Sequence, residues 1–171
     1  MGHVDHGKTT LLDHLRQTQI AKNELGGITQ KISGFTLKNQ FGEFSFIDTP
    51  GHVFFQDMRL TGASAADLVI LIVSAIEGVQ DQTKEVLKLL KEHKVPFLVC
   101  LNKIDIPGTN PELVEEQLID LGVDLEPYGG TIPIVYISAR TGLGVDLMLE
   151  LIQETSKGLN LRAVMDEGGL V

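Results

Sequence analysis

The chain has 171 residues, and 43% of them are hydrophobic, which is enough for one well-packed domain and gives no reason to expect two. Its formal net charge of −9 argues against nonspecific nucleic-acid binding by a broad basic face, because such binding depends on many Lys and Arg contacts to phosphate. The longest apolar run, 68–76, is too short to cross a membrane, and a single cysteine, Cys100, excludes an internal disulfide framework. We expect a monomer without a membrane segment, in which Cys100 is a buried core residue.

The first residues form a glycine-rich motif that is typical of phosphate binding. Residues 2–9 read Gly-His-Val-Asp-His-Gly-Lys-Thr, which matches GxxxxGK[ST], and apolar residues continue after it at helical spacing. Glycines let the backbone approach a phosphate, and the amides and dipole of a helix N-terminus attract its charge. We therefore expect Lys8 to balance the charge of the β- and γ-phosphates and Thr9 to bind Mg²⁺. Taken alone, the motif also fits a glycine-rich turn that only caps a helix.

Further residues of this loop are candidates for nucleotide contacts, namely Asp5, His6, Gly7 and Thr10. The histidines, His3 and His6, lack the cysteine, histidine and carboxylate neighbours of a structural zinc site, so they are expected to shape the loop or to face solvent. Asp5 would repel nearby phosphates, which makes it a candidate to hold a monovalent cation beside them.

A phosphate loop of this type normally follows a strand, but here only Met1 precedes Gly2. We therefore expect the chain to be a fragment in which the first strand is truncated. Without that central strand its neighbours would expose unpaired edges, so the isolated chain is expected to be unstable or to bind nucleotide poorly.

Two later segments are candidates to sense a γ-phosphate. In the glycine-rich segment 26–30, Thr29 offers a hydroxyl to Mg²⁺ and an amide to the phosphate. In the next segment, Asp48 can reach Mg²⁺ through water, and the amide of Gly51 can donate to the γ-phosphate. His52 is the first candidate for catalysis, because a histidine can orient an attacking water by donating or accepting a hydrogen bond. The alternative is a histidine that faces solvent at the start of a helix.

The alternation of element types predicts a three-layer α/β fold with a mostly parallel sheet, because short β-rich apolar runs alternate with segments at helical spacing. The expected strands are 44–47, 68–74, 96–101 and 132–137. Two β-like runs between Ser33 and Asp48 flank the turn-forming residues 39–42, which predicts an antiparallel hairpin.

Local signals also set the expected helices. The spacing of apolar residues over 81–94 predicts a surface helix with one buried stripe. Asn110 before a proline predicts the start of another helix, and Gly122 predicts its end. The remaining histidines, His14 and His93, fall in helical segments and are expected at the surface.

Two strand-like runs end in motifs that are suited to reading guanine. One run ends in Asn102-Lys103-Ile104-Asp105 and the other in Ser138-Ala139-Arg140. Both motifs fall at the carboxyl edge of the expected sheet, where open α/β folds bind ligands. The carboxylate of Asp105 can accept from the N1 and N2 hydrogens of guanine, so GTP is favoured over ATP, and an ATPase or kinase is disfavoured. In isolation, the first motif also fits a polar strand exit followed by a turn.

The motifs at 2–10 and 48–52 resemble those of the translational GTPases as a class. Within that class, Gly-Gly-Ile-Thr-Gln at 26–30 is similar to the first switch of the initiation factor two family. The resemblance covers essentially the whole chain. It implies a P-loop GTPase fold of the Ras-like type over 1–158, followed by a linker, 159–171, that leads toward a β-barrel domain.

The resemblance also implies roles for individual positions and for partners. The positions that match a motif are Lys8, Thr9, Thr29, Asp48, Gly51, His52, Asn102, Lys103, Asp105, Ser138 and Ala139. Arg140 stands where lysine is commoner, and its planar fork is expected to pack differently near the base. The implied activity is GTP hydrolysis stimulated by the large ribosomal subunit, with initiator tRNA held by other domains, in bacterial cytoplasm or an organelle matrix. The alternatives are a GTP-gated ribosome-binding module with negligible hydrolysis, and a GTPase of the elongation-factor type.

Overall fold

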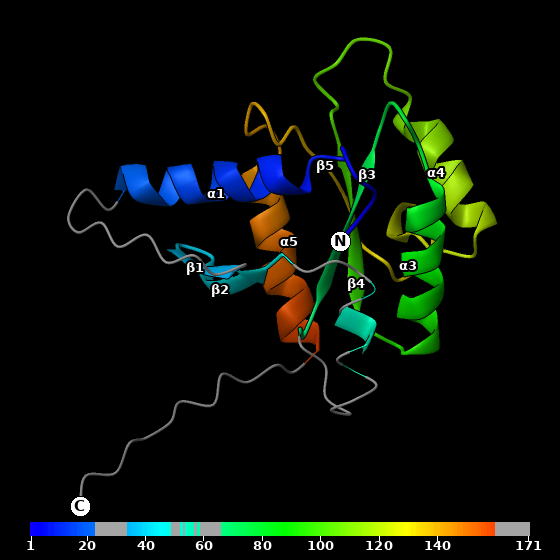
Figure 1. Ribbon diagram of the computed structural model, residues 1–171, viewed down its shortest axis with the longest axis horizontal. Helices are drawn as coiled ribbons and strands as arrows, with labels where there is room; N and C mark the ends of the chain where they lie inside the picture. Colours follow the sequence, from blue (N-terminus) through cyan, green and yellow to red (C-terminus); the bar gives the residue numbers. More distant parts are fainter. Residues whose placement is uncertain (23–33, 49–51, 53, 57, 59–65, 160–171) are drawn as a thin grey trace, which may run out of the picture.

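The molecule is built around three parallel strands whose two faces are both covered by helices (Figure 1). The computed structural model describes residues 1–22, 34–48, 52, 54–56, 58 and 66–159. In chain order the elements are α1 (Lys8–Lys22), β1 (Gly34–Asn39), β2 (Gly42–Ile47), β3 (Val69–Ser74), α3 (Asp81–Glu92), β4 (Phe97–Asn102), α4 (Pro111–Asp120), the 3₁₀ helix η1 (Glu126–Tyr128), β5 (Ile134–Tyr136) and α5 (Val145–Gly158). None of the helices in this described part combines the length and the apolar content that a membrane crossing requires.

The three-stranded sheet has the order β3-β4-β5, and its strands are all parallel. Continuous apolar runs form these strands because a parallel sheet is buried on both faces, and every residue of β4 is buried. The expected strands 68–74 and 96–101 agree with β3 and β4 to within one residue, whereas the expected strand 132–137 is shortened to the three residues of β5. The predicted α/β class is confirmed.

The alternation of side chains along the strands divides the core into two layers. One cluster joins β3 and β4 to α3 and α4, and its members include Leu71, Val99, Leu87 and Leu118. The other cluster joins the opposite face of the same strands to α1 and α5, and its members include Ile72, Cys100, Leu15 and Met148. Cys100 is fully buried, as predicted, and this burial raises the pKa of its thiol. The three layers of Figure 1 follow from this alternation.

The expected hairpin is present as β1 and β2. The two strands pair antiparallel, from Gly34 opposite Ile47 to Asn39 opposite Gly42. In the turn, the backbone N of Phe41 donates to Asn39 Oδ1 at 2.9 Å, a local bond that favours Asn at such a position. Among the described residues this hairpin forms a two-stranded sheet of its own.

The helix boundaries follow local backbone chemistry. Helix α3 ends at Glu92, two residues earlier than expected, because Lys94 adopts the left-handed region with φ +51°. Helix α4 begins as predicted, since the backbone N of Leu113 donates to the capping Asn110 Oδ1 at 3.2 Å. Gly122, with φ +75°, follows the end of that helix, which confirms the expected stop.

His14 and His93, which were expected at the surface, are each partly exposed and partly packed against the rest of the protein. The His93 ring stacks on the buried Phe55 ring with 5.5 Å between centroids. The His14 ring packs against Gly142, where an added Cβ would lie 2.6 Å from it. Both contacts join segments far apart in the chain, so helical spacing alone does not reveal them.

The first two residues lie beside β3. The backbone N of Ile72 donates to the Met1 carbonyl at 2.8 Å, and Gly2 forms a parallel bridge with Ile72. This pairing fixes the start of the glycine-rich loop at the carboxyl half of β3. The expected longer strand before the loop stays a prediction.

Candidate functional site

The glycine-rich loop connects β3-paired Gly2 to the N-terminus of α1, which begins at Lys8. Gly7 adopts φ +98°, and a Cβ added there would overlap with Asn102 Nδ2. Asp5 is also left-handed, with φ +66°, which is uncommon for a residue other than glycine. The loop therefore needs glycine at position 7 for two separate reasons, its dihedral angles and the close approach of Asn102.

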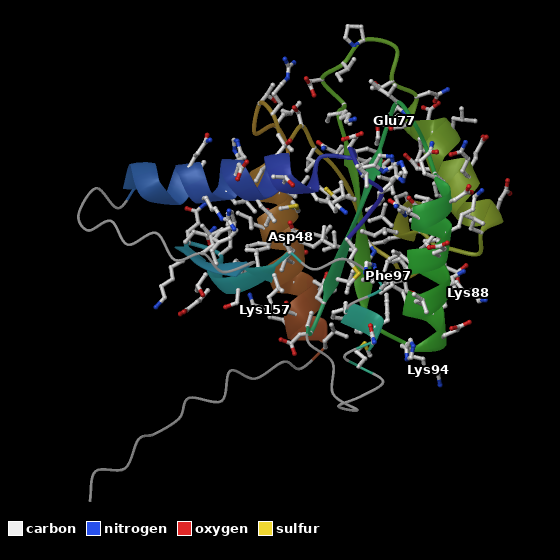
Figure 2. All side chains as sticks on the ribbon, in the orientation of Figure 1. Asp48, Glu77, Lys88, Lys94, Phe97 and Lys157 are labelled. Carbon is white, nitrogen blue, oxygen red and sulfur yellow. The ribbon has the colours of Figure 1, made fainter. Side chains whose placement is uncertain are left out.

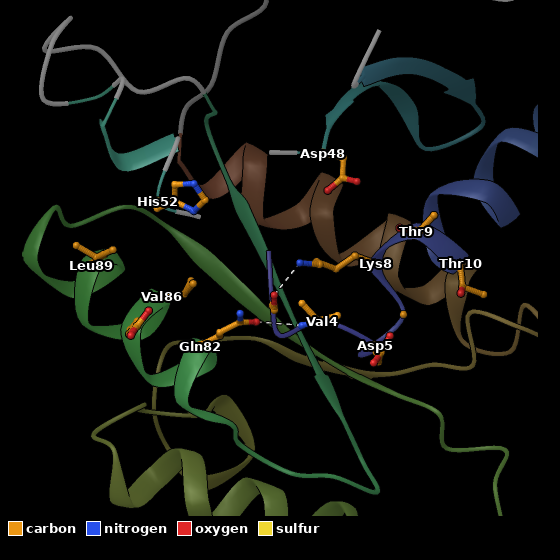
Figure 3. Close-up of a pocket in the computed structure, with 13 residues that line it drawn as sticks. Val4, Asp5, Lys8, Thr9, Thr10, Asp48, His52, Gln82, Val86 and Leu89 are labelled. Carbon is orange, nitrogen blue, oxygen red and sulfur yellow. Dashed lines mark hydrogen bonds between the residues drawn. The ribbon is translucent and has the colours of Figure 1, made fainter. Parts of the chain in front are cut away.

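Most of the predicted phosphate-side residues line one cavity of about 730 Å³ (Figure 3). Its lining includes Asp5, Gly7, Lys8, Thr9, Thr10, Asp48 and His52, together with residues of α3. The Lys8 ammonium donates to the Gly2 carbonyl at 2.8 Å, so the cation is held within its own loop. The free amides at the start of α1 and this ammonium make the cavity suited to an anion such as a phosphate chain.

In the part of the chain that the structure describes, the cavity offers too few protein ligands to bind a metal ion by themselves, but it fits a Mg²⁺ ion that is also bound by phosphate oxygens. Among the described residues, no group of three or more His, Cys, Asp or Glu side chains could hold a metal ion. The cavity offers the Thr9 hydroxyl and the half-buried Asp48 carboxylate. Mg²⁺ is commonly bound by one or two protein oxygens, substrate phosphates and water, which matches this sparse donor set.

His52 lies in a helical segment at the cavity and is exposed, whereas the neighbouring Phe54 and Phe55 are buried in the core. Its position agrees with the predicted catalytic role, which stays a prediction. The other two predicted γ-phosphate contacts, Thr29 and Gly51, lie outside the described residues.

The base-side motifs meet at the same edge of the sheet through Asn102. Its side chain is buried, with Nδ2 donating to the His6 carbonyl at 2.8 Å and Oδ1 accepting from the Ala139 backbone N at 2.9 Å. One hydrogen bond at Nδ2 and one at Oδ1 leave each atom a further donor or acceptor position, so the predicted contact of Asn102 with nucleotide stays a prediction.

The Asp105 carboxylate is held by the last motif. Arg140 donates to Asp105 Oδ2 from Nη2 at 2.6 Å and from Nε at 3.2 Å. Hydrogen bonding from the Ser138 hydroxyl, and then from Arg140, lowers the pKa of Asp105. The carboxylate is thus ionised at neutral pH and can accept two donors of a planar base, since a carboxylate has about four acceptor positions.

The two loop histidines behave differently from each other. His6 is fully buried, and its side chain does not line the cavity; its ring contacts the half-buried His3 edge-to-face, with 5.0 Å between centroids. Burial is the main cause that lowers the pKa of His6, so the ring is neutral. Of the two expected roles, facing solvent is wrong for His6, and shaping the loop stays a prediction. The predicted nucleotide contact can come only from the His6 backbone.

Two residues without a motif of their own in the sequence contact the phosphate loop or the base-side loop. Gln82 Oε1 accepts from the Val4 backbone N at 3.1 Å, and Glu77 Oε1 accepts from Lys103 Nζ at 2.7 Å. Figure 2 shows Glu77 at the carboxyl end of β3, at the opposite end of the sheet from Phe97. Glu77 follows the carboxyl end of a buried strand, as the base-side motifs do, and this position in the sequence could have identified it as a candidate site residue.

The comparisons with known proteins agree with this geometry. Residues 1–157 match the family described as Elongation factor Tu GTP binding domain. The chain belongs to this family. Its phosphate loop, Asp48 and the two base-side motifs therefore lie in a GTP-binding domain, and the resemblance to translational GTPases is confirmed.

Relatives within the family include initiation factors. The chain is 45% identical over 163 residues to translation initiation factor IF-2 of Chloroflexus aurantiacus, which covers 95% of this chain and 22% of that protein. GDP-bound aIF5B from Aeropyrum pernix superposes with a TM-score of 0.76 and 35% identity, covering 92% of this chain and 35% of that one. The apo form of translation elongation factor SelB from Methanococcus maripaludis superposes with a TM-score of 0.68 and 32% identity, and the match covers 96% of this chain and 34% of that one. The chain spans about a fifth of the length of the first relative.

Proposed function

We propose that this chain is the GTP-binding and GTP-hydrolysing part of a translation initiation factor. The observation that carries the proposal is the Asn102 side chain, which joins the phosphate loop at His6 to the base-side loop at Ala139. This link brings a phosphate-binding cavity and a guanine acceptor to one edge of the sheet. The similarity to IF-2 of Chloroflexus aurantiacus supports the choice of an initiation factor.

Different residues would bind the phosphates, the Mg²⁺ ion and the base of GTP. The amides at the start of α1 and the Lys8 ammonium would bind the phosphates, and Thr9 with Asp48 would hold Mg²⁺, which neutralises charge on the β- and γ-phosphates. Asp105 would accept from the N1 and N2 hydrogens of guanine. Adenine lacks that pair of donors, so ATP would leave the acceptor positions of Asp105 that face the base without donors.

The reaction would be attack of water on the γ-phosphorus with cleavage of its bond to the β,γ-bridging oxygen, which gives GDP and phosphate. The His52 imidazole would orient that water by a hydrogen bond. Because the His52 side chain is exposed, a partner that covers this face of the cavity would fix it in place. We propose the ribosome as that partner, with initiator tRNA bound by parts of the factor outside this chain.

The test is single-turnover GTP hydrolysis by the full-length protein, with and without ribosomes. His52→Ala is expected to lower the ribosome-stimulated rate by about 100-fold or more while GTP affinity changes little, because the loss concerns the transition state. Gln56→Ala, an exposed position in the same segment, is the matched control and is expected to keep the wild-type rate.

Two results would contradict the proposal. Unchanged stimulated hydrolysis in His52→Ala would remove the catalytic assignment. Negligible hydrolysis by the wild-type protein on ribosomes, with nucleotide state changing only ribosome affinity, would instead identify a GTP-gated binding module.

A further inference from the structure

Glu77 faces both halves of the site, although the proposed chemistry does not use it. Its Oε1 lies 2.7 Å from Lys103 Nζ on the base side, and its Oε2 lies 3.7 Å from His6 Nε2 on the phosphate side. We propose that Glu77 is a positioning residue that fixes the phosphate loop relative to the guanine-reading loop. This inference deepens the proposed function and rests on it.

The backbone of Glu77 is anchored to the end of β3 by a hydrogen-bonded turn. The hydroxyl of Ser74, a buried residue at the end of β3, accepts from the backbone N of Ile76 at 3.3 Å and of Glu77 at 3.2 Å. The backbone N of Gly78 donates to the Ser74 carbonyl at 2.9 Å and closes the turn. The Glu77 side chain therefore starts from a rigid point, as a positioning residue requires.

On the base side, Glu77 holds the ammonium of Lys103. Lys103 adopts a left-handed backbone with φ +70°, which is unfavourable for a residue other than glycine and persists only where its surroundings hold it. Asn102 fixes the chain immediately before it, and the Glu77 carboxylate fixes the far end of its side chain. The hydrogen bond from Lys103 is the main cause that lowers the pKa of Glu77, so this carboxylate is ionised at neutral pH.

On the phosphate side, the Glu77 carboxylate lies close to a buried donor, the His6 ring, whose pKa both Glu77 and the Ile72 backbone raise against the effect of burial. Among the described residues, neither ring nitrogen of His6 has a hydrogen-bond partner, and the ring is fully buried. A neutral imidazole carries one N–H, and leaving it unpaired is unfavourable. The present 3.7 Å from Nε2 to Glu77 Oε2 is longer than a hydrogen bond, but a shift of about 1 Å would form one. One carboxylate can satisfy both partners because its two oxygens point to different loops.

The consequence concerns ligands that touch both loops at once. A guanine nucleotide has its phosphates on one loop and its base on the other, so binding requires a defined spacing between them. Fixing that spacing before binding lowers the conformational cost of association. The partly exposed pair adds little to the stability of the fold, so its loss is expected to appear in nucleotide affinity and not in folding.

The first experiment titrates fluorescent GDP into the full-length protein. Glu77→Gln keeps the shape of the side chain and removes its charge, and it is expected to weaken GDP binding about fivefold. Glu116→Gln, at an exposed position of α4, is the control with unchanged affinity. Glu77→Asp keeps the charge but is too short to serve both partners, so its affinity is expected between those of Gln and wild type. Thermal unfolding of each variant shows that it is folded.

Two further readouts separate positioning from a general structural effect. In a Lys103→Met background, Glu77→Gln is expected to cause no further loss of GDP affinity, because its partner is already gone. In an NMR titration, Glu77→Gln is expected to lower the pKa of His6, whose other facing charged or titratable groups are His3 and Lys103. Wild-type affinity in Glu77→Gln, an additive loss in the Lys103→Met background, or an unmoved His6 titration would each overturn the inference. Failure of the wild-type protein to bind GDP would overturn the proposed function and this inference with it.

Discussion

The phosphate side and the base side of the site are built in different ways. The phosphate side consists of backbone geometry, in which a left-handed Gly7 leads into the first turn of α1, with Lys8 and Thr9 facing the cavity. The base side consists of a buried side-chain network in which Asn102 and Ser138 fix the loops. A phosphate can be bound by amides that any helix start offers, whereas a particular base needs particular side chains held in place. The Asn102 side chain connects the two sides, because it bonds to the backbone of His6 and of Ala139.

The largest expected effect comes from filling the space where the two sides touch. Gly7→Ala adds a Cβ that overlaps Asn102 Nδ2 at a residue with a left-handed backbone. Backbone strain and steric overlap together are expected to make the binding-competent form of the loop about 4 kcal/mol less favourable. GDP affinity measured by calorimetry is then expected to fall by roughly 1000-fold. Gly108→Ala is the matched control, since Gly108 also has a positive φ of +88° but no atom within 4 Å of an added Cβ. Equal effects of the two changes would show that overlap with Asn102 does not matter.

Removing the link itself is expected to damage the fold as well as the site. Asn102→Ala leaves the His6 carbonyl and the Ala139 amide without their partner inside the protein, which is expected to lower the free energy of unfolding by about 3 kcal/mol. Denaturant unfolding measures this loss. Asn110→Ala, which removes only the cap of α4, should cost about 1 kcal/mol. An Asn102 variant as stable as the Asn110 variant would contradict the role of Asn102 as a link.

The phosphate side should respond in affinity without a loss of stability. Lys8→Ala removes a cation that lies at the cavity and bonds only to the Gly2 carbonyl among the described residues. We expect GTP affinity to fall about 30-fold, which corresponds to about 2 kcal/mol for a hydrogen bond to a charged group, and the unfolding midpoint to stay near that of wild type. Lys84→Ala on the exposed face of α3 should change neither quantity. A Lys8 variant that unfolds more easily would place this residue in the structural network instead.

The smallest expected effect is a pH shift on the base side. Ser138 and Arg140 hold the pKa of Asp105 below its usual value, so the ionised acceptor is present above that lowered pKa and is lost only as the pH falls through it. Arg140→Ala removes the hydrogen bond and the charge that Arg140 contributes, and it is expected to move the acid loss of GDP affinity to higher pH. At pH 7 the affinity should change by less than about fivefold, because Arg140 is exposed. Titrations from pH 7 to about pH 2.5, which pass below the ordinary pKa of an aspartate, measure the shift with Arg16→Ala as control, and identical profiles would contradict it.

Local signals explain which parts of the structure could be predicted from the sequence. The phosphate loop, the hairpin turn and the cap at Asn110 depend on residues a few positions apart, and each of these was correct. The contacts that were missed join distant segments: the Asn102 side chain bonds to the carbonyl of His6 across 96 positions. Periodicity gives the buried face of a helix or strand but does not say which polar side chain will meet it there. The burial of His6 and the two-sided contact of Glu77 therefore required the three-dimensional structure.

The most direct test of guanine recognition compares nucleotides with different bases, GDP and XDP, in the wild type and in an Asp105→Asn variant. The Asp105 carboxylate accepts from the N1 and N2 hydrogens of guanine, whereas an amide in its place could donate to the oxygen that xanthine carries at that position. Affinities of GDP and XDP for the full-length wild-type protein and its Asp105→Asn variant measure this directly. We expect the wild type to prefer GDP and the variant to prefer XDP. An unchanged preference in the variant, or equal binding of both nucleotides by the wild type, would contradict guanine recognition at this edge of the sheet.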